Sequence, residues 1–253
     1  MSDVTFEAEK QSYDEHGFVI VRGLLDDTDF AELRVNLDRY IRDVVPTLSD
    51  GDAFYEDRGR PETLKQMQRM GCDSFFCDYV QHPRWIALAE ALVGEPVTIN
   101  QPEWFNKPPG TNHVTPPHQD NYYFCLVPSN VVTIWLALDS IDVGNGCLRY
   151  VAGSHRCGIR PHAASKILGF SQGLTDYAPA DFTREVAIPL RPGDAVAHHC
   201  MTVHRADANM SDDRHRRSFA MVFNGVSCER DELAHTRYLN SARMQQGKMG
   251  LRT

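Results

Sequence analysis

The strongest constraint on the fold is the order in which helical and strand-like segments follow one another. Before residue 95 the pattern is mainly helical, with one short apolar strand at Phe18–Arg22 between two predicted helices. After residue 95, short apolar runs alternate with turns that contain Gly, Pro, Asn or Asp. Because strands and helices do not alternate along the chain, a doubly wound parallel sheet is excluded. The order predicts an α+β fold: a double-stranded β-helix (a jelly-roll or cupin-like core) faced by N-terminal helices.

The ends of the predicted elements carry recognisable signals. Residues 5–16 predict a helix that ends at Gly17, and residues 83–93 predict a helix that ends at Gly94. A helix also begins near residues 26–28, with apolar residues at three-to-four spacing from 30 to 44. The polar stretch 47–61 predicts an exposed loop. The predicted strands after the helical part are residues 96–100, 131–138, 147–151, 185–190, 194–197 and 218–223.

Length and charge narrow the class of protein. The 253 residues suit a single domain, 1–253, with a helical part at about 1–94, a β core at about 95–225 and a polar tail at 226–253. The net charge of −8 argues against a nucleic-acid partner. We expect no membrane span, because no apolar run approaches 20 residues, and no signal peptide, because the N-terminus has no basic start followed by an apolar stretch. The 7 scattered cysteines predict free thiols in a cytoplasmic protein.

Two histidines and one carboxylate are the first candidates for chemistry. His118 and Asp120 form a His-x-Asp tripeptide, and in a strand their side chains would point to the same face. His204 follows in a later strand region, with His198 and His199 as rivals for the same role. Two imidazoles and one carboxylate on one face of a metal leave positions open for a chelating co-substrate and O₂. This is the arrangement used by non-haem Fe(II) oxygenases.

Basic residues near the last predicted strand are the second set of candidates. Arg214, Arg216 and Arg217 precede residues 218–223, and an arginine recognises a carboxylate through two parallel hydrogen bonds. One of them would bind the far carboxylate of a dicarboxylate co-substrate.

Several motifs in a fixed order resemble the phytanoyl-CoA dioxygenase family of Fe(II)- and 2-oxoglutarate-dependent oxygenases. The resemblance covers most of residues 5–225. The motifs are Asn106-Lys-Pro-Pro-Gly110, His118-Gln-Asp120, Thr133-Ile-Trp-Leu-Ala-Leu-Asp139, Asn145-Gly-Cys-Leu148, Gly153-Ser-His155, Pro192-Gly-Asp194, His204-Arg-Ala-Asp-Ala-Asn209 and Arg216-Arg217.

The resemblance implies roles for individual residues. It makes His118, Asp120 and His204 the iron ligands, and it places Arg216 on the distal carboxylate of 2-oxoglutarate, with Trp135 also touching the co-substrate. The chain departs from the family pattern in the segment between His204 and Arg216, which is one residue longer than usual, so Arg217 or Arg214 remains an alternative. The retained Asp120 favours hydroxylation over halogenation.

The resemblance also implies the reaction: hydroxylation of a C–H bond of a small metabolite, with Fe(II), 2-oxoglutarate and O₂ consumed and succinate and CO₂ released. Desaturation, cyclisation or an acyl-CoA substrate are alternatives within the family, and a zinc hydrolase or a cupin-like metal-binding protein are alternatives outside it. Four residues are candidates for contact with the primary substrate. They are Gln101, Lys107, Asn121 and Tyr122.

Overall fold

The chain places helices before most of its strands, as the sequence predicts. The computed structural model describes residues 5–49, 51–167 and 170–248. The α-helices are α1 (Glu7–His16), α2 (Asp27–Arg39), α3 (Ser74–Tyr79), α4 (Pro83–Val93), α5 (Asn121–Phe124), α6 (Pro179–Phe182) and α7 (Glu232–Lys248). The strands are β1 (Phe18–Val21), β2 (Ala53–Tyr55), β3 (Leu64–Met67), β4 (Val97–Ile99), β5 (Glu103–Lys107), β6 (Thr115–His118), β7 (Leu126–Val127), β8 (Val131–Ala137), β9 (Leu148–Val151), β10 (His162–Ile167), β11 (Phe170–Leu174), β12 (Glu185–Ile188), β13 (Ala195–His199), β14 (His204–Ala206), β15 (Arg216–Gly225) and β16 (Glu229–Arg230).

Two antiparallel sheets form the core. The larger has the order β1-β13-β8-β15-β5-β3-β2, with β4 also paired to β15, and the smaller has the order β12-β9-β14-β6. One apolar cluster joins their inner faces, with Trp135 and Ala220 from the large sheet and Leu148 and Tyr150 from the small one. Apart from β2 and β3, neighbouring strands within each sheet come from separate parts of the chain. The arrangement confirms the predicted double-stranded β-helix.

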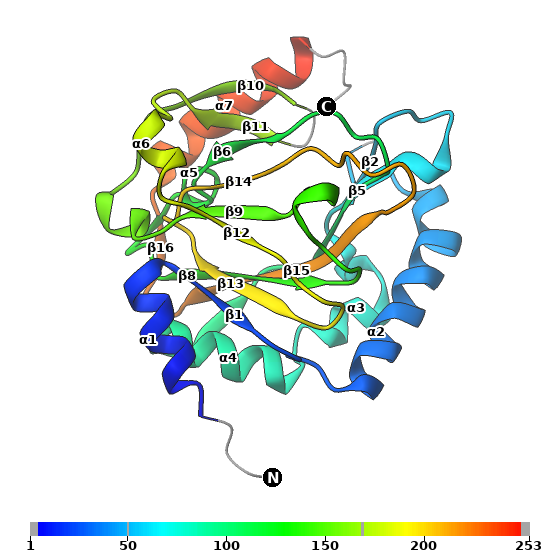
Figure 1. The fold of residues 1–253 in the computed structure, drawn as a ribbon, viewed down its shortest axis with the longest axis horizontal. Helices are drawn as coiled ribbons and strands as arrows, with labels where there is room; N and C mark the ends of the chain where they lie inside the picture. Colours follow the sequence, from blue (N-terminus) through cyan, green and yellow to red (C-terminus); the bar gives the residue numbers. More distant parts are fainter. Residues whose placement is uncertain (1–4, 50, 168–169, 249–253) are drawn as a thin grey trace.

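Helices cover the outer face of the large sheet (Figure 1). Side chains of α4 such as Trp85 and Leu88 share a buried cluster with Phe219 and Met221 of β15. Along β15 the odd-numbered residues thus face the helices, while Ala220 faces the other sheet. This alternation of strand side chains also places Arg216 on the inner face.

The predicted helix ends agree with the structure. Gly17 (φ 84°) and Gly94 (φ 81°) end α1 and α4 in the left-handed conformation that glycine adopts without steric cost. Asp26 begins α2, because its side chain accepts hydrogen bonds from the backbone N–H groups of Thr28 (3.0 Å) and Asp29 (2.9 Å).

The prediction of an exposed loop at residues 47–61 is wrong for the middle of this segment. Residues 53–55 form β2, which pairs with β3, and β3 in turn pairs with β5. Ala53 and Phe54 are buried. The strands are short and flanked by charged residues, so their apolar pattern is too brief to stand out in the sequence. As a result, the N-terminal part adds strands to the large sheet besides the helices that cover it.

The polar tail contains a helix that packs on the rest of the chain. Its residues 232–248 form α7, which contacts α5, β10 and β11. Figure 1 shows α7 beside β10, far from α4. Among the described residues, no helix combines the length and apolar character needed to cross a membrane.

Replacing Trp85 by alanine is expected to destabilise the fold by about 3–5 kcal/mol, the usual cost of removing a large buried aromatic side chain. Trp85 is fully buried and meets the ring of Phe219 edge-on at 5.8 Å. Urea unfolding followed by circular dichroism measures the change. Val35→Ala is the control, since Val35 is 67% exposed on α2 and its truncation removes little contact. Equal urea midpoints for the two variants would contradict the buried packing of Trp85 against Phe219.

Candidate active site

His118 and Asp120 meet where a strand ends and a helical turn begins. His118 is the last residue of β6, and Asp120 lies just before α5 with helical backbone angles (φ −61°, ψ −34°). The expectation that His118 and Asp120 share one face of a strand is therefore wrong, because the strand ends at His118. The bend of the chain, rather than strand alternation, brings the imidazole and the carboxylate together.

His204 completes a compact cluster. It begins β14, directly opposite His118 in the neighbouring strand β6. Asp120 Oδ1 lies 3.5 Å from Nε2 of His118 and 3.5 Å from Nε2 of His204. One candidate ligand atom from each of the three residues lies within 4.8 Å of the others. All three side chains are almost completely buried.

Backbone carbonyls orient both imidazoles. Nδ1 of His118 lies 2.8 Å from the carbonyl oxygen of Pro116, and Nδ1 of His204 lies 3.0 Å from that of Thr202. With Nδ1–H donating to these carbonyls, each ring directs Nε2 toward Asp120. Burial lowers the pKa of both histidines, which favours the neutral form that binds metals.

The carboxylate of Asp120 is held by its second oxygen. Oδ2 accepts a hydrogen bond from Thr133 Oγ1 at 2.9 Å and lies 3.0 Å from His198 Nε2. The other nitrogen of His198 lies 3.0 Å from the hydroxyl of Tyr150, which can donate to it and leave Nε2–H to bind Asp120. Burial alone raises the pKa of Asp120, but His204, His198 and His118 together bring that pKa far below its usual value.

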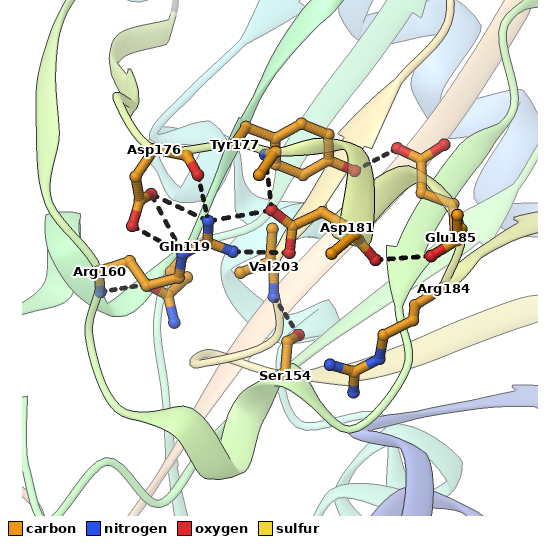
Figure 2. Close-up of polar contacts among 12 residues, drawn as sticks. Gln119, Ser154, Arg160, Asp176, Tyr177, Asp181, Arg184, Glu185 and Val203 are labelled. Carbon is orange, nitrogen blue, oxygen red and sulfur yellow. Dashed lines mark hydrogen bonds and ion pairs between the residues drawn. The ribbon is translucent and has the colours of Figure 1, made fainter.

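Gln119, between the two candidate ligands, points away from them into the protein. Its side-chain nitrogen donates to the carbonyl oxygens of Gly158 (2.9 Å) and Met201 (2.8 Å), and its oxygen accepts from the backbone N–H of Arg160 (2.8 Å). Figure 2 shows Gln119 in this network, with the Arg160 guanidinium between Asp176 and Asp181. The bend that carries both candidate ligands is therefore anchored to two other loops.

The cluster lies in a cavity of about 130 Å³ between the two sheets. Trp135, Leu148 and Ala206 form part of its wall. Glu56, Lys65 and His113 also line it and contact one another: Glu56 lies 3.1 Å from Lys65 Nζ and 3.3 Å from His113 Nε2. The β2–β3 segment that sequence analysis placed partly in an exposed loop thus contributes to the cavity wall.

Of the three candidate arginines, the structure brings only Arg216 to this cavity. Its guanidinium lies 5.3 Å from the ring centre of Trp135, and its buried Nε has no hydrogen-bond partner among the described residues. Burial lowers the pKa of Arg216 to about 10, so the group stays charged at neutral pH. Arg217 and Arg214 instead bind Asp139 (2.7 Å) and Asp142 (2.8 Å).

Lys107 lies in the same cavity and pairs with Arg216 across β5 and β15. Its ammonium donates to the carbonyl oxygens of Asp207 (2.6 Å) and His113 (3.2 Å). Burial, with a contribution from Arg216, lowers the pKa of Lys107 to about 6. At neutral pH Arg216 therefore keeps its charge while Lys107 is mostly neutral, and the charged Arg216 makes this part of the cavity suited to an anion.

The other candidate substrate residues lie outside the described cavity wall. Asn121 bonds both backbone groups of Leu126, and Tyr122 stacks on His162 at 4.2 Å. Gln101 is exposed in the loop between β4 and β5. Residues 121–124 form the helical turn α5, so their side chains do not alternate between two faces as they would in a strand.

Sequence reasoning missed several residues near the metal cluster. Gln66 lines the cavity from β3, and Tyr150 supports His198 from β9. The short apolar triplet at residues 53–55 was the available signal for the β2–β3 segment. His198 was expected to be a hydrogen-bonded strand residue, and it is, with Asp120 as one partner.

Two imidazoles and one carboxylate, converging in the interior of a double-stranded β-helix, fit a divalent metal with one face left open. Each donor is oriented by a separate hydrogen bond, as metal ligands commonly are. The fold and this donor set together define a mononuclear non-haem iron oxygenase of the two-histidine, one-carboxylate class.

Comparison with known proteins identifies the family within this class. The model of the phytanoyl-CoA dioxygenase (PhyH) family matches residues 13–218, and the chain belongs to this family. The peroxisomal phytanoyl-CoA dioxygenase of Mus musculus is 27% identical over 253 residues, which cover 93% of this chain and 73% of the relative. The 1-deoxypentalenic acid 11-beta-hydroxylase of Streptomyces arenae is 26% identical, covering 82% of this chain and 76% of the relative.

A solved structure supports the same class. The epimerase SnoN, crystallised with Fe³⁺, alpha ketoglutarate and nogalamycin RO, superimposes with a TM-score of 0.70 at 25% identity and covers 88% of this chain and 84% of SnoN. Family membership, the cluster and this likeness make the chain an iron- and 2-oxoglutarate-dependent dioxygenase that acts on a small molecule.

Replacing His198 by phenylalanine is expected to weaken metal binding about 10- to 100-fold, the usual effect of removing a group that orients a metal ligand. Calorimetric titration of the metal-free protein with Co(II) measures the change. His199→Phe is the matched control: the His199 ring lies 6.0 Å from that of Tyr13 and accepts a hydrogen bond from the backbone N–H of Met201, on the far side of the strand from Asp120. An equal loss of metal affinity in both variants would show that the hydrogen bond between His198 and Asp120 does not contribute to metal binding.

Proposed function

We propose that the chain hydroxylates a C–H bond of a small metabolite, with Fe(II) bound by His118, Asp120 and His204. The observation that carries this proposal is the convergence of these three donors in a cavity that also contains Arg216. When bound, iron supplies activation of O₂ coupled to decarboxylation of 2-oxoglutarate to succinate and CO₂. The protein itself orients the reactants and excludes water.

We assign the metal ligands atom by atom. Nε2 of His118 and His204 and Oδ1 of Asp120 would bind the metal, because the opposite atom of each group already has another partner. Thr133 and His198 hold Oδ2 of Asp120, which favours binding through a single oxygen. The carboxylate at this position occupies the place that a halide would need, which supports hydroxylation over halogenation.

We assign the distal carboxylate of 2-oxoglutarate to Arg216. A buried guanidinium without a carboxylate partner is costly, and an anionic co-substrate would satisfy it. Trp135 lies against the guanidinium and limits its movement. Lys107 is a poorer candidate, because its lowered pKa leaves it mostly neutral at neutral pH and its nitrogen already donates to backbone carbonyls. Arg217 is a poorer candidate, because Asp139 binds it.

Epimerisation, desaturation or cyclisation is the second candidate outcome, favoured by the likeness to the epimerase SnoN. All begin with removal of a hydrogen atom from the substrate. The cavity of about 130 Å³ is smaller than the roughly 300–1,000 Å³ of pockets for drug-sized ligands. Its size supports a small metabolite over an acyl-CoA thioester.

We also propose that the enzyme works in a reducing compartment such as the cytoplasm. All 7 cysteines are free thiols. Cys125, Cys147 and Cys200 are buried, where a thiol behaves as a small apolar side chain. A reducing compartment would preserve these thiols and also suits Fe(II).

Anaerobic titration with Fe(II) and then 2-oxoglutarate tests the proposed chemistry. We expect a visible charge-transfer absorption band when the co-substrate chelates the metal, and loss of both metal binding and the band in Asp120→Ala. Asp142→Ala is the control, since this carboxylate binds Arg214 outside the cavity. Retention of the band in Asp120→Ala would refute the ligand assignment. Two results with the unmodified protein would favour the non-oxygenase alternatives. One is hydrolase activity that depends on Zn(II), and the other is metal binding without the charge-transfer band.

The co-substrate assignment is tested by comparing Arg216→Gln with Arg217→Gln. We expect Arg216→Gln to raise the Kd for 2-oxoglutarate about ten- to a hundredfold, as for loss of a hydrogen bond between charged groups. Arg217→Gln breaks the ion pair with Asp139, so it should affect unfolding more than binding. Calorimetry and thermal unfolding measure the two effects. The reverse pattern would move the assignment to Arg217.

A further inference from the structure

The C-terminal helix α7 packs against the turn that follows two of the candidate metal ligands. It lies beyond residue 218, where the match to the family model ends, and the proposed chemistry assigns it no role. α7 contacts α5, β10 and β11, and Figure 1 shows it beside β10. α5 begins directly after Asp120, and the backbone N–H of Tyr123 in α5 donates to the carbonyl oxygen of Asp120 at 2.9 Å. The helix therefore reaches the segment that carries His118 and Asp120.

The ring of Tyr123 connects α7 to His118. It meets the imidazole of His118 at 5.7 Å, with the two planes at 76°. It also meets the ring of Tyr238 in α7 at 5.5 Å, with the planes at 90°. Edge-on packing of aromatic rings is directional, so each ring limits the rotation of the next. The three side chains thus form a continuous row from α7 to a candidate metal ligand.

Hydrogen bonds join α7 to Tyr123 by a second route, through β11. The hydroxyl of Tyr123 donates to the carbonyl oxygen of Gln172 at 2.7 Å. The side chain of Gln172 is buried, and its nitrogen donates to the hydroxyl of Ser241 in α7 at 2.9 Å. Both ends of Tyr123, the ring and the hydroxyl, therefore depend on contacts that lead to α7.

The β10–β11 hairpin packs on β6, the strand that ends at His118. Gly173 of β11 lies close to Pro116, since a Cβ on this glycine would meet the Cβ of Pro116 at 3.1 Å. The carbonyl oxygen of Pro116 orients the His118 ring. Within the described residues β10 and β11 pair only with each other, and a two-stranded hairpin needs a packing partner to be stable. α7 supplies one, with Gln245 donating to the carbonyl oxygen of Ser165 at 2.8 Å.

We propose that α7 is part of the metal site and that Tyr123 is a positioning residue, through which the packing of α7 fixes the ring of His118. The inference rests on the proposed function, because it assumes that His118 binds the metal through Nε2. The Pro116 carbonyl holds Nδ1 of the imidazole and the Tyr123 ring limits its rotation, so Nε2 points toward Asp120 before a metal binds. A ligand that is already oriented binds a metal more tightly than one that must be ordered on binding.

Co(II) binding to Tyr238→Ala tests the inference. We expect the Kd for Co(II) to rise about three- to tenfold, as for the loss of one edge-on aromatic pair. The visible absorption spectrum of the Co(II)-loaded protein should also change, because His118 is less well oriented. Tyr238→Phe keeps the ring and should retain the affinity and the spectrum of the unmodified protein. Met244→Ala is the matched control, since Met244 is 65% exposed on the same helix, and it should change neither property.

A double variant separates this role from general stabilisation of the fold. Tyr123→Ala should weaken Co(II) binding at least as much as Tyr238→Ala, and the two changes together should have no further effect, because Tyr238 acts through the ring of Tyr123. Equal losses from Tyr238→Ala with and without the Tyr123 ring would overturn the inference. So would Co(II) affinity in Tyr238→Ala equal to that in Met244→Ala. If the alanine variant does not fold, Tyr238→Leu keeps an apolar side chain at the contact and allows the same comparison.

Solvent exchange of the Nδ1 proton of His118, followed by NMR in the metal-free protein, tests the inference without a metal. We expect this proton to exchange about three- to tenfold faster in Tyr238→Ala than in Met244→Ala, because the ring that restrains His118 is itself less restrained. Equal exchange rates in the two variants would refute the role of α7. Absence of Co(II) binding to the unmodified protein would instead refute the proposed ligand assignment, and the exchange measurement would still decide the role of α7.

Discussion

The active site depends on one buried carboxylate. Asp120 lies among three imidazoles, and its two oxygens have different partners: Oδ2 faces Thr133 and His198, and Oδ1 faces His118 and His204. A charge in the interior is tolerated only when such partners surround it. Those partners come from β6, β8, β13 and β14, so both sheets must be in register before the carboxylate is satisfied. The carboxylate and its partners are therefore brought together only in the folded arrangement of both sheets.

The two faces of the large sheet have different roles, since the outer face contributes mainly to stability and the inner face carries the cavity. The outer face packs large apolar side chains against α4, whereas the inner face carries the polar groups of the cavity. Hydrogen bonds to backbone carbonyls orient the polar groups of the site, as for His118 and the carbonyl of Pro116. Hydrogen bonds of Gln119 fix the bend between His118 and Asp120. This arrangement keeps the reacting groups fixed without help from the substrate.

The sequence predicts the class of fold and the three-residue cluster because these depend on local patterns and ordered motifs. It leaves open which arginine reaches the cavity, because Arg216 and Arg217 are adjacent and only their strand register separates them. It misses the β2–β3 segment, whose strands are stabilised by pairing with the distant β5. It also places His118 and Asp120 on one face of a strand, since the bend after His118 depends on tertiary contacts of Gln119.

Ser218 and Ala220 are small residues that follow Arg216 on the inner face of β15. Their neighbours Phe219 and Met221 are committed to the opposite face. Ala220 lies opposite Trp135, a residue of the cavity wall, so a larger side chain at position 220 would press on the wall from the neighbouring strand. The shape of the cavity can thus change through the inner face of this strand while the face that packs on the helices keeps its residues.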